Sequence, residues 1–463
     1  MCRLRGGACA LLIVALPCWA ESDLRVLNAV KRRDPKTVAA LIAKHADVNA
    51  AQPDGATPLA WATFLADDAT ADLLLAAGAK INTADEYGET PLTLACANGD
   101  AALAAKLLKG GADAKVARWD GESALMIAAG AGNVDIVNQL IAHGADVNGV
   151  ESRKGQTALM WAAAEAHADV VKTLVQHGAN VKAASKSGFT PLLFAATKND
   201  ALSAGILLAA GAEPNSALPD GTKALTVAAS WHSTAVASQL VDSGADPNVA
   251  DRAGNAPLHI AAQVGDVELI QKLLAKGGDP NVRTPKAAGG GGGRGGGGGF
   301  RPVSGEQTPL LMAARAGQIE AMRALIAGGA DPKLRAQDGT TFLMSAVGSA
   351  QIEAVKFAWE YDKDVKVVTT GGATMMHASV SGTANGATQE AQDRVCAVIQ
   401  FLADHGAALD DKNAQGRTPI DLADGLPIDK AVDLLTELIE KSGAKPKSPS
   451  KRMMDLHGVS AGK

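Results

Sequence analysis

The sequence predicts an all-α repeat solenoid of about twelve helix-turn-helix repeats with short β-hairpin loops. A Thr-Pro-Leu-like tripeptide recurs at a spacing near 33 residues, and a glycine follows most copies at a fixed distance. The 463-residue chain is 47% apolar but only 3% aromatic, so its core must be built from small side chains. Such a core suits a thin array of closely packed helices better than one thick globule.

The tripeptide sets the repeat register along almost the whole chain. Successive copies start 33, 33, 34, 33, 33, 33, 52, 33, 33 and 44 residues apart. The two long intervals are one repeat plus an insertion, and a half-matching unit at 26–49 brings the total to twelve repeats. The copies start at Thr57, Thr90, Ser123, Thr157, Thr190, Lys223, Ala256, Thr308, Thr341, Thr374 and Thr418.

Each element of the repeat has a physical reason. The Thr hydroxyl caps a helix, and Pro at the next position has no N–H to leave unpaired. In the copy with Lys223, Thr222 is the expected substitute for the cap. A second helix follows and ends at a glycine 21 residues after the Thr position, as at Gly144, because glycine adopts the left-handed conformation that terminates helices. A further glycine closes the loop before the next repeat.

This unit resembles the ankyrin repeat, with its T-P-L-H-x-A core and G-A-D-V-N link. The resemblance covers about residues 23–422 and implies a curved stack of antiparallel helix pairs, with hairpin loops projecting to one side. His259 and His377 occupy the histidine position of the core. The resemblance makes both of them structural hydrogen-bonding residues.

Residues 1–20 read as a signal peptide. Arg3 and Arg5 precede a short apolar stretch, and Cys18 and Ala20 place small residues before an expected cut at Glu21. A signal anchor is the alternative, but the apolar run is too short to span ~30 Å of hydrocarbon. We expect no membrane insertion after cleavage, and a location in the bacterial periplasm or outside the cell.

Residues 21–440 are then the solenoid. One insertion, at 284–304, contains a glycine run that should form a loop with no packed structure. A second, at about 383–394, should lengthen the loop between two helices. Residues 441–463 are basic, with lysines among Ser, Pro and Gly, and are expected to be a disordered tail.

The sequence offers no sign of catalysis. Metal and nucleophile spacings such as H-E-x-x-H, G-x-S-x-G and C-x-x-C do not occur, and the glycine run lacks the Lys-Ser/Thr ending of a phosphate loop. We therefore expect neither an enzyme nor a cofactor or metal. The net charge of −5 gives no support to nucleic-acid binding. Cys96 takes an alanine position of a helix and should be a buried, inert thiol.

The resemblance places partner binding on loop residues four, three and one before Thr and on helix residues seven and eight after it. Five of the fifteen aromatic residues fall on these outward positions, all between repeats 2 and 7. Trp61, Trp161 and Phe194, at the fourth position after Thr, are expected to pack inward. The candidate partner-binding residues are Phe64, Leu65, Tyr87, Trp119, Arg153, Lys154, Lys186, Phe189, Lys198, Trp231 and Arg252.

Aromatic and arginine side chains in an exposed row are typical of the centre of an interface. The leading hypothesis is an exported, monomeric scaffold that binds another protein through repeats 2–7. The alternative is an accessory or inhibitory subunit of an exported enzyme or redox protein.

Overall fold

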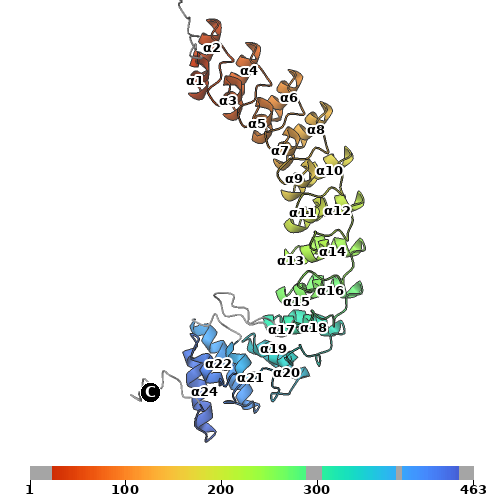
Figure 1. Ribbon diagram of the computed structural model, residues 1–463, viewed down its shortest axis with the longest axis vertical. Helices are drawn as coiled ribbons and strands as arrows, with labels where there is room; N and C mark the ends of the chain where they lie inside the picture. The colour runs from red at the N-terminus through yellow and green to blue at the C-terminus, as the bar shows by residue number, and fades with distance from the viewer. Residues whose placement is uncertain (1–22, 288–304, 382–387, 448–463) are drawn as a thin grey trace, which may run out of the picture. The chain divides into compact units, whose positions relative to one another are not determined.

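The computed structural model describes residues 23–287, 305–381 and 388–447, which contain 24 α-helices (Figure 1). The signal peptide expected at 1–20, the glycine run of the first insertion, residues 383–387 of the second and most of the basic tail lie outside these ranges. Consecutive helices form antiparallel pairs, here called first and second helices, and within each of the two units described below the odd-numbered first helices pack on one another. The repeat architecture predicted from the tripeptide spacing is confirmed.

The chain divides into two compact units. Unit 1 runs to Ala162 and includes Gln176–Ala179, whereas unit 2 comprises Ala163–Val175 and the chain from Asn180 on. Helices α9 (Ala158–Ala164) and α10 (Ala168–Gln176) therefore contribute to both. The remaining helices of unit 1 are α1 (Arg25–Lys31), α2 (Pro35–Ala43), α3 (Pro58–Phe64), α4 (Asp68–Ala76), α5 (Pro91–Asn98), α6 (Ala101–Lys109), α7 (Ala124–Gly130) and α8 (Val134–Ala142).

Unit 2 continues the pattern with seven further pairs. They are α11 (Pro191–Lys198), α12 (Ala201–Ala209), α13 (Ala224–Ser230), α14 (Thr234–Asp242), α15 (Pro257–Val264), α16 (Val267–Ala275), α17 (Pro309–Ala316), α18 (Ile319–Ala327), α19 (Phe342–Val347), α20 (Ile352–Tyr361), α21 (Met375–Ser381), α22 (Gln389–Asp404), α23 (Pro419–Ala423) and α24 (Asp429–Lys441).

Hydroxyl caps start the first helices as expected. The Thr57 hydroxyl accepts from Ala60 N at 3.2 Å, and Thr90 and Ser123 cap α5 and α7 in the same way. The expected substitution by Thr222 fails, because α13 begins at Lys223 without a side-chain cap and the Thr222 hydroxyl bonds to Asp220 instead.

Glycines with positive φ end the second helices, as at Gly78 (φ +83°) and Gly144 (φ +89°). Where His45 replaces this glycine, it adopts φ +58° itself. Asp362 does not, and α20 there runs to Tyr361 before the backbone turns extended. The terminating conformation thus persists at one of these two substituted sites.

The β-hairpin loops are simpler than expected. Among the described residues there is no β-strand, and the loops contribute only two isolated bridges, Ala117 with Ser123 and Ala217 with Lys223. The loops form turns closed by backbone hydrogen bonds, as where Asp85 N donates to Glu89 O at 3.0 Å. The loops are therefore turns and do not form a ladder of strands.

Both insertions enter between helices. The first begins at a closed base, where Thr284 N donates to Gln307 O at 3.0 Å and Gln307 N donates to the Thr284 hydroxyl at 2.9 Å. Helices α15 and α17 pack together on either side of it. The described part of the second insertion extends α22, capped by Thr388, to 16 residues, so residues 389–394 lengthen a helix and not the loop.

The two core histidines are structural, as the resemblance implied. His259 is fully buried, and its Nδ1 accepts from Ala256 N at 3.0 Å while Nε2 donates to Gln307 O at 2.9 Å. His377 repeats the arrangement with Thr374 N and Arg417 O. Each ring ties its own helix start to the next repeat, and this pattern of bonds requires the neutral ring.

Replacing His259 by Ala should lower the free energy of unfolding by about 2 kcal/mol or more, because two backbone groups lose their partners. Burial lowers the pKa of His259. At pH values below the ordinary pKa of about 6.5, the unfolded chain therefore binds more protons than the folded one. The free energy of unfolding should decrease as the pH is lowered through this range. Urea unfolding at neutral pH and at pH 5 tests both effects.

The control is His143→Ala, since His143 is exposed and bonds only Gln139 O at 2.8 Å. It should cost less than ~1 kcal/mol. Equal losses in the two variants would contradict the structural role of His259.

Candidate functional site

The candidate partner-binding residues lie mainly on the tip loops, the short segments that precede the first helices. In unit 1 these are residues 51–56, 84–89, 117–122 and 150–156; in unit 2 they are 184–189, 217–222 and 250–255. The large aromatic side chains are strongly exposed: Phe64 57%, Tyr87 57%, Trp119 70% and Trp231 62%. Arg153, Lys154, Lys186, Lys198 and Arg252 are exposed as well, whereas Leu65 and Phe189 are half-buried.

Backbone hydrogen bonds join the tip loops of unit 1 in series. Glu86 N donates to Asp54 O at 2.7 Å, Trp119 N to Tyr87 O at 3.2 Å, and Ser152 N to Asp120 O at 2.8 Å. We call these three bonds the tip-loop ladder. It holds Tyr87 and Trp119 on adjacent loops in fixed register, although neither side chain is buried.

Carboxylates shape the individual loops. Asp85 accepts from Tyr87 N at 2.9 Å and Glu89 N at 2.8 Å. The loop at 150–156 is one residue longer, and there the longer Glu151 accepts from the backbone of Arg153, Lys154 and Gln156. Burial raises the pKa of Glu151, but these N–H donors outweigh it and the net pKa is lowered.

Arg118 lies within this region but does not offer its charge to solvent. Its guanidinium pairs with Glu89 at 2.5 Å and with Glu122 at 2.7 Å, and all three side chains are largely covered. Sequence reasoning missed this cluster. The glutamates one residue before Thr90 and Ser123 were the available signal, since adjacent loops bring them to either side of one arginine.

Unit 2 carries Lys186, Phe189, Lys198, Trp231 and Arg252. Phe189 packs on Phe194, with ring centroids 5.2 Å apart, and so is less available than the other aromatics. At 219 a proline replaces the residue whose N–H bonds the preceding loop in unit 1, so that bond cannot form there.

The fourth-position aromatics are half-buried, not packed inward as expected. The Trp61 ring makes an edge contact with Phe64 at 5.6 Å, and Lys31 Nζ lies 4.3 Å from its centroid. Leu94, at the same position of the next repeat, is also half-buried. This position therefore forms the edge of the first-helix face, where the neighbouring repeat covers only part of a large side chain.

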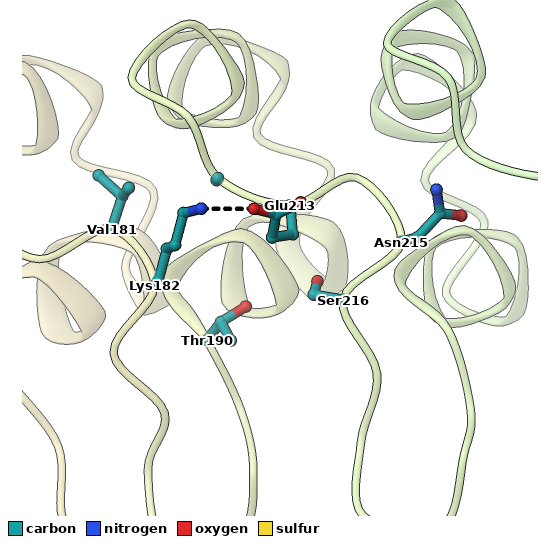
Figure 2. A pocket seen from close by; sticks show the side chains of 7 residues that line it. Val181, Lys182, Thr190, Glu213, Asn215 and Ser216 are labelled. Carbon is teal, nitrogen blue, oxygen red and sulfur yellow. Dashed lines mark hydrogen bonds and ion pairs between the residues drawn. The ribbon is translucent and has the colours of Figure 1, made fainter.

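Unit 2 contains a pocket of about 280 Å³ (Figure 2), lined by Val181, Lys182, Thr190, Ala212, Glu213, Asn215 and Ser216. Most repeats place Asn at the position of Lys182. Asn215, for example, donates to Gly244 O at 3.1 Å and accepts from Asp246 N at 3.0 Å in the next repeat. Lys182 instead pairs with the exposed Glu213. The pocket is thus the space left where no asparagine at position 182 bonds to the next repeat. It is smaller than a typical ligand site.

Other chemistry is equally sparse in the described ranges. No three His, Cys, Asp or Glu side chains there are placed to hold a metal ion. Cys96 is buried, and this raises the pKa of its thiol to about 12, as expected for an inert packing residue. No helix in the same ranges is both long and apolar enough to cross a bilayer.

Stacked helix pairs joined by short turns define a helical repeat protein. The family model for ankyrin repeats (3 copies) matches residues 26–118, 96–185, 125–217, 192–284 and 310–389. The chain belongs to the ankyrin repeat family. Members of this family are typically non-catalytic scaffolds for protein–protein interaction.

The tip-loop ladder depends on Gly88, which has φ +81°. A Cβ there would lie 2.8 Å from Arg118 Cα and 2.9 Å from Trp119 N, both backbone atoms that cannot rotate away. Gly88→Ala should therefore lower the free energy of unfolding by at least ~2 kcal/mol, the sum of a left-handed alanine and a backbone clash.

Gly78→Ala is the matched control, since Gly78 has φ +83° and nothing within 4 Å of the added Cβ. It should cost only ~1 kcal/mol. Urea unfolding of both variants measures the difference, and equal losses would show that the loops are free to move apart.

Proposed function

We propose that the protein is an exported scaffold that binds a partner protein through the tip loops and first-helix ends of repeats 2–7. The observation that carries this proposal is the exposure of Trp119 and Trp231, at 70% and 62%. Large aromatic side chains contribute most to binding when an interface covers them, and they are unusual on the surface of an alanine-rich protein.

Two features support this choice of surface. In unit 1 the tip-loop ladder holds Tyr87 and Trp119 in position, which lowers the entropy lost on binding. In each unit, exposed cationic side chains accompany the aromatics: Arg153 and Lys154 in unit 1, and Lys186, Lys198 and Arg252 in unit 2. Polar rims of this kind set partner choice more than they add affinity.

Export rests on the basic and apolar leader at 1–20, and it favours a partner in the periplasm or outside the cell. The same surface would also serve an accessory or inhibitory subunit of an exported enzyme or redox protein. Affinity purification from the envelope fraction separates the two, because it yields either a structural partner or an enzyme.

Trp119→Ala and Trp231→Ala should each leave stability within about 0.5 kcal/mol of the parent, because neither ring is buried. Each should weaken partner binding by ~2 kcal/mol or more, roughly thirtyfold. Melting curves and pull-downs with the purified partner provide the two measurements.

Leu92→Ala is the control for folding. Leu92 is 1% exposed, and its truncation should cost ~2–5 kcal/mol of stability. Tryptophan variants that remain folded and keep full partner binding would place the interface elsewhere.

The mature chain should begin at Glu21. N-terminal sequencing of the protein recovered from the medium or the periplasm tests this, and a chain beginning at Met1 would remove the basis for export.

A further inference from the structure

The tip loops around Tyr87 and Trp119 are strongly acidic. Residues 51–56, 84–89 and 117–122 together contain six carboxylates and one guanidinium. That guanidinium, Arg118, is already held between Glu89 and Glu122. The charge that these loops present to a partner is therefore negative.

Three of these carboxylates, Asp54, Asp85 and Glu86, act on the exposed side chain of Tyr87. A hydrogen bond with Glu86 and the charge of Glu86, followed by the charges of Asp54 and Asp85, raise the pKa of the Tyr87 phenol. Asp54 belongs to the preceding loop, so two loops contribute charge to one aromatic side chain. Trp119 lies on the third loop and bonds to Tyr87 O through its backbone N–H at 3.2 Å.

This arrangement suits a cation with an apolar stem. The face of an aromatic ring carries negative potential and attracts Lys or Arg, and nearby carboxylates add a charge-assisted hydrogen bond. The tip-loop ladder fixes the backbone positions from which the two rings project before binding. The loop at 150–156 has Arg153 and Lys154 exposed and ends the acidic stretch.

We propose that Tyr87, Trp119 and Glu86 form a docking site for a Lys- or Arg-bearing segment of the partner protein. This inference rests on the proposed function and adds the chemistry of the partner. The aromatic rings cover the aliphatic stem of the basic side chain, and Glu86 receives its charged end. Asp54 and Asp85 contribute to the field, but both also shape their own loops, through Ala56 N and through Tyr87 N and Glu89 N.

The test uses the purified full-length protein and three labelled synthetic peptides of equal length. One alternates Arg and Lys with Gly and Ser, the second has Gln in place of each basic residue, and the third has Glu. Fluorescence anisotropy measures binding. The basic peptide should bind at least about tenfold more tightly than the Gln peptide, and the Glu peptide should not bind.

Glu86→Gln removes one charge and keeps the shape of the side chain, so it should weaken binding of the basic peptide roughly threefold to tenfold. Tyr87→Ala and Trp119→Ala should do the same. Asp135→Asn is the matched control: Asp135 is an exposed carboxylate of unit 1 in the first turn of α8, away from the tip loops. Its loss should leave binding unchanged. Circular dichroism verifies the fold of each variant.

Equal binding of the basic and Gln peptides overturns the proposal. An effect of Asp135→Asn as large as that of Glu86→Gln overturns it too, because it would indicate general attraction of the peptide to an acidic protein. If Trp119→Ala loses the native partner but the wild type shows no preference for the basic peptide, this inference fails and the proposed function stands. If Trp119→Ala and Trp231→Ala both retain the native partner, the proposed function fails, and with it the partner chemistry inferred here.

Discussion

The close packing of first helices on one another through alanine is the contact on which the rest of the structure depends. At the fifth position after each capping residue the side chain is small and fully buried, as at Ala62, Ala95 and Ala128 in unit 1 and Ala195 and Ala228 in unit 2. A larger side chain there would push the neighbouring helix away, since packed interiors absorb added volume poorly. Because each repeat buries its apolar face only against its neighbours, no repeat is stable alone.

This contact leaves the loops free to carry function. The stack is held by caps, buried leucines and the asparagine and histidine bridges between repeats, so the outward residues of the tip loops contribute little to folding. Tyr87 and Trp119 illustrate the separation, because their backbones belong to the tip-loop ladder while their rings remain in solvent. Substitution of these exposed side chains should therefore leave the stack undisturbed.

Most of the fold could be predicted from local sequence because its rules are local. A hydroxyl cap and a glycine with positive φ each act within one helix end, and the structure confirms them at most repeats. The two buried histidines could be assigned because their position in the repeat fixes both of their partners. The predictions that were wrong concern residues whose structure depends on a neighbouring repeat or on a competing local hydrogen bond. Thr222 turns to Asp220, residues 389–394 extend a helix, and Trp61 is covered only as far as the adjacent repeat allows.

The candidate site was less predictable than the fold for the same reason. The exposure of nine of the eleven predicted residues follows from their place in the repeat, but their surroundings do not. The pairing of Arg118 with Glu89 and Glu122 joins two loops, and so does the approach of Asp54 to Tyr87. A single repeat contains only part of either arrangement. Each arrangement becomes evident only when residues about 33 positions apart, on adjacent loops, are considered together.

The same dependence on neighbours explains how the stack accommodates an insertion at 284–304. The residues whose hydrogen bonds hold the adjacent repeats together lie on either side of the inserted segment. Thr284 and Gln307 close its base with two backbone-directed bonds, and Gln337 of the next repeat bonds both the N–H and the carbonyl of Ala287. His259 spans the insertion to reach Gln307 O. The contacts between α15 and α17 are therefore independent of the inserted length, and loop entropy grows only logarithmically with that length. An ankyrin array can thus gain a long loop at a tip without losing the helix contact on which it depends.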